Sequence, residues 1–386
     1  MDSGRHAPVS ILHCITGLNV GGAELMLARY LHRGHVSPAD CAVLSLMDLG
    51  PVAPRVHAHG VAIHSLELPQ GRLPLGSVPA LVWHLRRMRP RLIHGWMYHG
   101  NIAASIGALA GRLNVPVVWS IHHSLYDAAT EKLLTRRVIR LSAALSSRTA
   151  AIIYCSHVAA AQHEALGFDP RRSVVIHNGI DCAEFRPDRW ARHRLSKRLG
   201  LPPGRLLIGS VGRAHPMKAQ HDLVAALALL VRAGRDVHGI FVGPGHLEGS
   251  VMEWAEKEGI ADRISTLGGD EDVPAIMPGL DIHAISSTWG EAFSLATAEA
   301  MASGVPAVVT DVGDCPRVVG DVGLVARRGD PESLAASLAE LIDLGIEGRQ
   351  SLGARARQRI LDYFSMEQYV SRHAALYETV LAPLPQ

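Results

Sequence analysis

Short apolar runs alternate with segments of helical period along nearly the whole chain. In the first half of the sequence the apolar runs cover residues 9–15, 41–46, 91–96, 115–121, 150–155 and 174–176. Parallel strands covered on both faces have this continuous apolar character, whereas half-exposed strands alternate. Helix-period segments lie between the runs, near 22–33, 77–88, 99–112 and 131–147. The pattern predicts a doubly wound parallel α/β sheet.

A second series of apolar runs follows at 206–211, 237–242, 264–267, 282–285 and 305–309. The segment between the two series, 185–205, is charged and contains three prolines, so it is expected to be a linker. A chain of 386 residues is also too long for one core and suits two domains of roughly 150–200 residues. We therefore expect an α/β protein with two Rossmann-like domains, 1–185 and 186–365, that face each other across a ligand-binding cleft.

Composition excludes several classes of protein. A hydrophobic fraction of 48% and a charged fraction of 19% exclude a disordered or fibrous chain. The net charge is only +2, so nucleic acid is not an expected partner. The charge is uneven, however, because the window 81–150 holds ten basic residues against Asp127 and Glu131. The net charge of that window is +8, so the net charge of the rest of the chain is −6.

The basic window lies in the first domain, where Arg136, Arg137 and Arg140 share a predicted helix with several leucines. A face of this kind is typical of helices that lie on a membrane surface. We expect weak, reversible contact of 81–150 with anionic membranes. The alternative is a solvated helix face without a membrane partner.

The cysteines and the N-terminal residues indicate where in the cell the protein is expected. The five cysteines are scattered without a C-x-x-C pair, which favours reduced thiols in the cytoplasm. The N-terminus has no signal-peptide pattern, and the longest membrane-like run, 101–110, is about half of the ~20 residues needed to span a bilayer. We expect a soluble cytoplasmic protein that can lie at the inner face of the membrane.

Two strand ends carry residues suited to binding phosphate. Gly21 and Gly22 follow the first strand and precede a helix, where backbone N–H groups and the helix dipole favour an anion. A plain strand-to-helix turn is the alternative. In the second domain Arg213 and Lys218 flank the turn after 206–211. There the guanidinium of the arginine, with its paired N–H donors, and the ammonium of the lysine would bind a diphosphate. Lys218 is one of only four lysines in the chain.

A third feature is the pair Glu291 and Glu299, set among small and apolar residues after strand 282–285. Glu291 is expected on a loop and Glu299 one to two turns into the following helix. Backbone N–H groups near 293–295 would face an anion, and the carboxylates would accept hydrogen bonds from sugar hydroxyls. A glutamate in an apolar stretch needs a partner, which favours a functional role.

In this order the motifs resemble those of the family 4 retaining glycosyltransferases of GT-B fold, over nearly the whole chain. The matching segments are Gly21-Gly22-Ala23-Glu24, His177-Asn178-Gly179-Ile180-Asp181 with Phe185 and Pro187, Val211-Gly212-Arg213 with Lys218, Val242-Gly243-Pro244-Gly245, Leu267-Gly268, and the E-x7-E segment with Gly304-Val305-Pro306. We also expect 366–386 to form a C-terminal helix that crosses back to the first domain.

The resemblance implies a role for each candidate residue. Arg213 and Lys218 would bind the donor diphosphate, Glu299 the ribose, and Glu291 the transferred sugar. The backbone of Ala292, Phe293, Ser294 and Leu295 would assist, and the Gly21-Gly22 turn would close over the phosphates. The family also places a histidine after the fifth strand of the first domain. Here that strand ends in His122-His123; we assign the role to His122 and hold His123 in reserve.

The resulting hypothesis is a retaining hexosyltransferase that moves a sugar from a nucleoside-diphosphate donor, with UDP-sugar favoured, to a hydroxyl of a glycan or lipid acceptor. Cell-surface polysaccharide or glycolipid assembly is the expected process. Histidine spacing indicates no structural zinc, and Asp270-Glu271-Asp272 is interpreted as an accidental D-x-D match, so no metal or other cofactor is expected. A nucleotide-sugar epimerase, a phosphorylase and a catalytically silent binding protein of the same fold remain alternatives.

Overall fold

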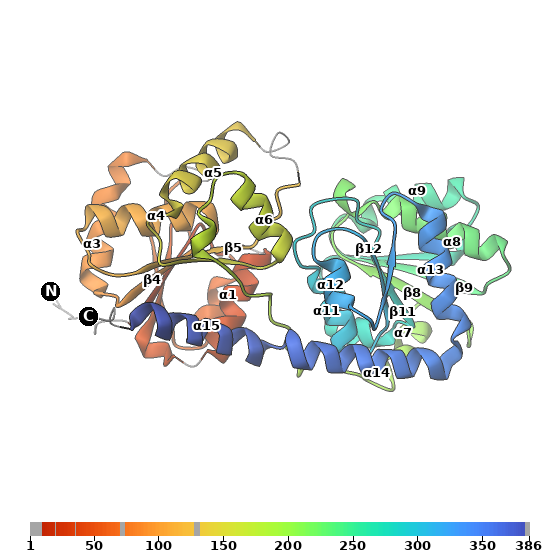
Figure 1. Cartoon of the computed structure of the whole chain (residues 1–386). Coiled ribbons are helices and arrows are strands. Elements are labelled where there is room, and N and C mark those ends of the chain that lie inside the picture. Colours follow the sequence, from red (N-terminus) through yellow and green to blue (C-terminus); the bar gives the residue numbers. More distant parts are fainter. Residues whose placement is uncertain (1–9, 20, 35, 70–73, 127–131, 383–386) are drawn as a thin grey trace. The chain divides into compact units, whose positions relative to one another are not determined.

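The computed structural model of the chain describes residues 10–19, 21–34, 36–69, 74–126 and 132–382 (Figure 1). It divides the chain into two units. The first unit comprises Met1–Gly179 and Met366–Gln386, and the second comprises Ile180–Ser365.

The first unit is built on a seven-stranded parallel sheet with strand order β3-β2-β1-β4-β5-β6-β7. Its strands are β1 (Ile11–Ile15), β2 (Cys41–Ser45), β3 (Ala62–Ser65), β4 (Leu92–Trp96), β5 (Val117–Ile121), β6 (Ala151–Tyr154) and β7 (Ser173–Val175). The five inner strands, β1, β2, β4, β5 and β6, are buried along their whole length. That burial explains their continuous apolar character and confirms the doubly wound sheet expected from the sequence.

Helices cover this sheet on both faces. They are α1 (Gly22–Arg33), α2 (Ala53–His57), α3 (Val78–Met88), α4 (Met97–Ala110), α5 (Leu133–Ser146), α6 (His157–Ala165) and α15 (Met366–Leu381). The C-terminal helix α15, blue in Figure 1, packs against α1, drawn in red. The core of this unit is large and aromatic-rich, with Trp96, Trp119 and Tyr154 fully buried.

The second unit is built on a six-stranded parallel sheet with strand order β10-β9-β8-β11-β12-β13. Its strands are β8 (Leu206–Val211), β9 (Val237–Val242), β10 (Ile264–Leu267), β11 (Ile282–Ala284), β12 (Ala307–Thr310) and β13 (Leu324–Ala326). Its helices are α7 (Ala191–Arg198), α8 (Gln220–Arg232), α9 (Ser250–Lys257), α10 (Val273–Ile276), α11 (Leu295–Ala302), α12 (Cys315–Val319), α13 (Pro331–Asp343) and α14 (Gly345–Tyr363). Two parallel Rossmann-like sheets are thus present, as expected.

Three sequence-based expectations differ from the structure. The segment 185–205 is not a linker: it contains α7, and Phe185, Ala191 and Leu195 are buried in the second unit. For the same reason the boundary between the units falls at Gly179 and Ile180, earlier than the expected 185. Strands β3 and β13 were also missed, because β3 is a half-buried edge strand and β13 is three residues long. No helix within the described segments is both long and apolar enough to cross a membrane.

Candidate functional site

A buried ion pair marks the carboxyl edge of the second unit's sheet. Lys218 follows β8, Glu291 follows β11, and these two strands are neighbours in the sheet. The Lys218 Nζ lies 2.5 Å from the Glu291 Oε1. The Glu291 side chain is only 7% exposed, whereas Lys218 is 20% exposed. A buried carboxylate needs such a partner, and the ammonium group keeps further N–H donors for a ligand.

A hydroxyl-rich segment, Ser286-Ser287-Thr288, holds this pair in place. The Ser287 hydroxyl donates to the Glu291 Oε1 at 2.7 Å, and the Ser286 hydroxyl donates to the Lys218 carbonyl at 2.9 Å. The Thr310 hydroxyl in turn donates to the Ser287 carbonyl at 2.6 Å. Sequence reasoning missed these positioning residues, although three hydroxyl side chains directly after a buried strand were a usable signal.

Arg213 lies on the same edge, in the loop between β8 and α8. Its side chain is exposed, and one guanidinium nitrogen lies 3.9 Å from the Met217 sulfur. The loop itself is fixed, since the Gln220 side chain donates to the Arg213 carbonyl at 3.0 Å. The neighbouring Gly243 has a φ of +141°, and a side chain there would collide with the Gly212 carbonyl. Arg213 is therefore a solvent-facing cation on a well-supported loop.

The start of helix α11 borders Glu291. The Ser294 hydroxyl bonds the Thr297 hydroxyl at 2.9 Å and does not cap the helix, so first-turn N–H groups are left for another partner. Phe293 is buried in the core, and Glu299 is half-buried on the helix, as its spacing from Glu291 predicts. Gly313 has a φ of +58°, and any side chain there would strike the Glu291 carbonyl. The E-x7-E segment is thus packed tightly around the Glu291 backbone.

Two histidines near Lys218 are held neutral. Burial and the Lys218 charge lower the pKa of His283, on β11, to about 3. Partial burial, with the charges of Arg213 and Lys218, also lowers the pKa of His215. Positive charge at this edge therefore comes from the lysine and the arginine.

In the first unit, the turn between β1 and α1 carries the other predicted phosphate-binding residues. Gly21 precedes the helix in extended conformation, and Gly22 is its first residue, with open space around it. The Glu24 carboxylate folds back over Gly21, where a side chain at that position would collide with it. Burial raises the pKa of Glu24. An anion approaching this helix end would have to displace that carboxyl group.

The structure distinguishes the two histidines after β5. His123 Nδ1 lies 3.2 Å from the Tyr98 hydroxyl, which also bonds His163 Nε2 at 2.7 Å, so His123 belongs to a structural network. His122 Nδ1 lies 3.0 Å from Asn178 Oδ1, whereas His122 Nε2 is buried without a hydrogen-bond partner among the described residues. Burial lowers the pKa of His122 to about 4. His122 therefore has one ring nitrogen that makes no hydrogen bond to the described part of the chain.

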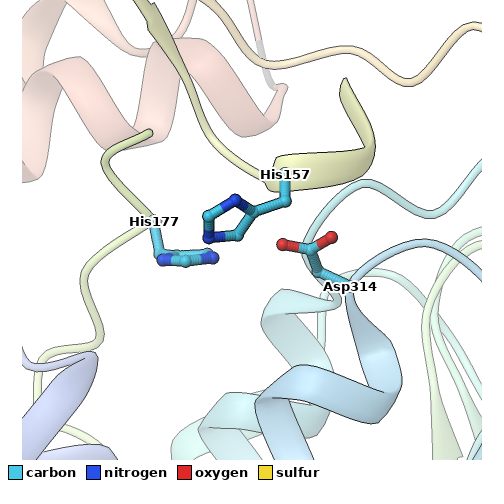
Figure 2. Close-up of side chains that lie close together, drawn as sticks. All are labelled: His157, His177 and Asp314. Carbon is cyan, nitrogen blue, oxygen red and sulfur yellow. The ribbon is translucent and has the colours of Figure 1, made fainter. Parts of the chain in front are cut away.

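Further histidines lie at the carboxyl ends of β6 and β7. His157 begins α6 and His177 follows β7, with ring centroids 5.4 Å apart; Figure 2 shows both side chains. Asp314, also drawn in Figure 2, precedes α12 of the second unit. His157 was not singled out from the sequence, although its place just after a buried strand was a signal. The carboxyl edge of the first sheet is therefore rich in imidazole groups.

The Asp270-Glu271-Asp272 segment has a structural use. Arg198 donates through both terminal nitrogens to the Glu271 carboxylate, at 2.7 and 2.5 Å. The Arg198 guanidinium lowers the pKa of Glu271. The central acid of the segment is therefore committed to holding α7 against the loop after β10.

The predicted site residues fall into two groups. In the second unit the structure joins Lys218 and Glu291 directly, with Arg213 and the start of α11 on the same sheet edge. Gly21, Gly22 and His122 occupy the corresponding edge of the first unit's sheet. Each edge offers a helix N-terminus and polar side chains. The second unit's edge also combines two cations with a buried carboxylate, a set suited to a phosphorylated, hydroxyl-bearing ligand.

Comparisons with known proteins agree with these features. Residues 20–184 match the model of "Glycosyltransferase Family 4", and residues 191–359 match the model of "Glycosyl transferases group 1". The lipopolysaccharide core biosynthesis mannosyltransferase LpsB of Rhizobium meliloti is 29% identical over 335 residues, 83% of each chain. The N-acetyl-alpha-D-glucosaminyl L-malate synthase of Bacillus anthracis is 25% identical over 375 residues, 95% of each chain.

Solved structures show the same fold. Anabaena Alr3699/HepE in complex with UDP gives a TM-score of 0.84 at 21% identity and covers 96% of this chain and 100% of that one. A sucrose-phosphate synthase from Thermosynechococcus elongatus gives a TM-score of 0.75 at 17% identity, over 97% of this chain and 99% of that one. With two successive family models matched and a GT-B fold throughout, the chain belongs to the family 4, group 1 glycosyltransferases.

Proposed function

We propose that this glycosyltransferase moves a sugar from a nucleoside-diphosphate donor to a hydroxyl group with retention of the anomeric configuration. The observation that carries the proposal is the Lys218–Glu291 pair beside the exposed Arg213 at one strand edge. Two cations suit a diphosphate, and a carboxylate fixed among hydroxyl groups suits a sugar. UDP-sugars are the favoured donors, because the structurally similar HepE was solved with UDP and with UDP-glucose.

The acceptor is proposed to be a hydroxyl of a glycan or glycolipid in cell-surface polysaccharide assembly. LpsB, the relative named above, acts in lipopolysaccharide core biosynthesis.

In the proposed reaction the sugar passes through an oxocarbenium-like transition state while negative charge grows on the leaving diphosphate. Arg213, Lys218 and the N–H groups at the start of α11 would stabilise that charge. The Glu291 Oε1 accepts from both Lys218 and Ser287, which fixes the carboxylate and directs its Oε2 to a sugar hydroxyl. We propose that it orients the sugar through hydrogen bonds, and that the acceptor attacks on the face from which the diphosphate leaves.

A panel of nucleotide sugars tests the proposal. The matching donor should raise the melting temperature, and incubation with an acceptor should give a glycoside whose anomeric configuration, read by NMR, equals that of the donor. Activity should persist in a chelator, since we propose that no metal takes part. Inversion, transfer to inorganic phosphate, epimerisation of the donor alone, or binding without turnover would each point to one of the alternatives and against this proposal.

We further propose that the first unit contacts anionic membranes through α3, α4 and α5, neighbouring helices that carry exposed leucine and tryptophan side chains. On α5, Leu133 is 71% and Leu134 60% exposed, beside the exposed Arg137 and Arg140. Trp83 on α3 is 55% exposed, and the Arg87 guanidinium stacks 5.3 Å above its ring. Leucine and tryptophan next to arginine suit the boundary between acyl chains and anionic headgroups. The protein would then act at the cytoplasmic face of the membrane.

This surface predicts a measurable lipid preference. The protein should cosediment with phosphatidylglycerol-containing vesicles at low salt. Replacing Leu133 and Leu134 by serine should weaken binding at least tenfold, because full burial of one leucine side chain contributes about 1.5–3 kcal/mol and a tenfold change needs about 1.4 kcal/mol. Leu247→Ser is the matched control, since Leu247 is 69% exposed but lies in the second unit. Equal binding to phosphatidylcholine vesicles, or an equal loss in the control, would contradict the membrane contact.

A further inference from the structure

Asn178 and His122 form a pair that sequence reasoning did not connect. Asn178 lies in the segment after β7 and His122 directly follows β5, 56 residues earlier in the chain. The Asn178 Oδ1 and the His122 Nδ1 are 3.0 Å apart, and Asn178 is only 6% exposed. A carboxamide oxygen only accepts hydrogen bonds, so the proton of the imidazole must lie on Nδ1.

The orientation of the imidazole is fixed by two further contacts. Trp96, the last residue of β4, stacks on the His122 ring with centroids 5.4 Å apart and planes 7° from parallel. The His122 backbone N–H points at the Met97 sulfur, 3.4 Å away. Its Nε2 is buried and has no hydrogen-bond partner among the described residues. The ring is thus clamped with one unshared nitrogen lone pair.

The other end of the pair is fixed by helix α15. A Cβ at Gly179, next to Asn178, would lie 2.7 Å from both the Met366 sulfur and the Tyr369 Cβ, so only glycine lets the chain pass so close to α15. The C-terminal helix therefore sets the position of Asn178, and Asn178 sets that of His122. These contacts all lie within the first unit.

We infer that Asn178 is a positioning residue that holds His122 as the Nδ1–H tautomer, so that Nε2 accepts a hydrogen bond from a substrate hydroxyl. The identity of that hydroxyl rests on the proposed function. The tautomer of His122 is independent of the proposed function. The titratable groups acting on this ring are His94 on β4 and His373 on α15, and burial keeps both neutral. Neither of these two groups carries a charge that would favour the Nε2–H tautomer of His122.

Asn178→Asp tests the inference with little change in shape. The new carboxylate still accepts from Nδ1–H but favours the imidazolium, and an adjacent opposite charge of this kind raises a histidine pKa by about 1–3 units. In the imidazolium Nε2 carries a proton and no longer accepts. Because the His122 pKa is about 4 in the wild type, this shift brings it to about 5–7. We therefore expect kcat to fall about tenfold near pH 5, the effect of one hydrogen bond, and to recover by about pH 8. A purely structural role would give a loss that does not depend on pH.

Long-range ¹H–¹⁵N NMR of histidine-labelled protein reads the tautomer directly, with the His122 signals assigned by His122→Gln. Near pH 5 we expect protonated Nδ1 and bare Nε2 in the wild type, protonation of both nitrogens in Asn178→Asp, and a mixture of tautomers in Asn178→Ala. An Nε2–H tautomer in the wild type, or an unchanged pattern in Asn178→Asp, overturns the inference. This measurement needs no activity, so absence of transfer in the wild type would count against the proposed function alone.

Discussion

Replacing Lys218 by alanine should lower the turnover of sugar transfer by about 10²–10³, the usual effect of removing one charge-stabilising donor. The Glu291 carboxylate holds the Lys218 ammonium group at 2.5 Å, and the Ser286 hydroxyl donates to the Lys218 backbone carbonyl. The ammonium group is therefore oriented before the donor arrives. Pre-oriented charge costs no reorganisation during the reaction, and this is why a single lysine has so large an effect. The measurement is kcat and kcat/KM with the matching donor.

The same substitution also leaves Glu291 buried without its cation, which destabilises the fold and adds to any loss of turnover. Arg213→Ala separates the two effects, because the Arg213 side chain is exposed and its removal should leave the melting temperature unchanged. A loss of about 10²–10³ is expected there too. Lys257→Ala, at the exposed end of α9, is the matched lysine control and should keep full activity. Near-normal turnover in both the Lys218 and Arg213 variants would rule out the diphosphate assignment.

Much of this architecture is predictable because buried parallel strands leave a strong pattern in the sequence. Strands β8, β9 and β10 have the bounds that their apolar runs predict, and every position of β8 and β9 is buried. The pattern fails at β3, where an edge strand mixes Ile63 with His64 and Ser65. It also fails at α7, whose many charged residues hide the two positions that bury it, Ala191 and Leu195.

For the site, the sequence predicts which residues follow a strand but not which of them contact each other. Lys218 and Glu291 each follow a strand, and parallel strands bring such residues to one edge, but their direct contact depends on the pairing of β8 with β11. The Asn178–His122 bond depends on β5, β6 and β7 lying in succession and on the close passage of α15 at Gly179. Contacts set by tertiary packing leave no local spacing in the sequence, which is why these partners were missed.

The first unit should lose stability steeply on mild acidification, because it buries several neutral histidines around α15. His13 on β1, His94 on β4 and His373 on α15 are fully buried, with rings 5.5 and 6.1 Å apart in succession. Burial lowers the pKa of His13 to about 3 and that of His373 to about 4, and it lowers that of His94 well below its usual value. In the unfolded chain the same groups titrate near 6.5.

Between pH 6.5 and about 4 the unfolded chain therefore binds protons that the folded unit does not, so stability falls as the pH falls. Each such histidine contributes about 1.4 kcal/mol per pH unit, and several together approach the ~5–15 kcal/mol stability of a typical domain. Urea unfolding at pH 7.5 and 5.0, followed by tryptophan emission, to which the fully buried Trp96 and Trp119 of the first unit contribute, measures the change. His373→Gln should reduce the pH dependence by about one proton, whereas the exposed His57→Gln should not. A midpoint that does not change between pH 7.5 and 5.0, or an equal effect of the two variants, would show that the buried histidines are not the acid-sensitive element.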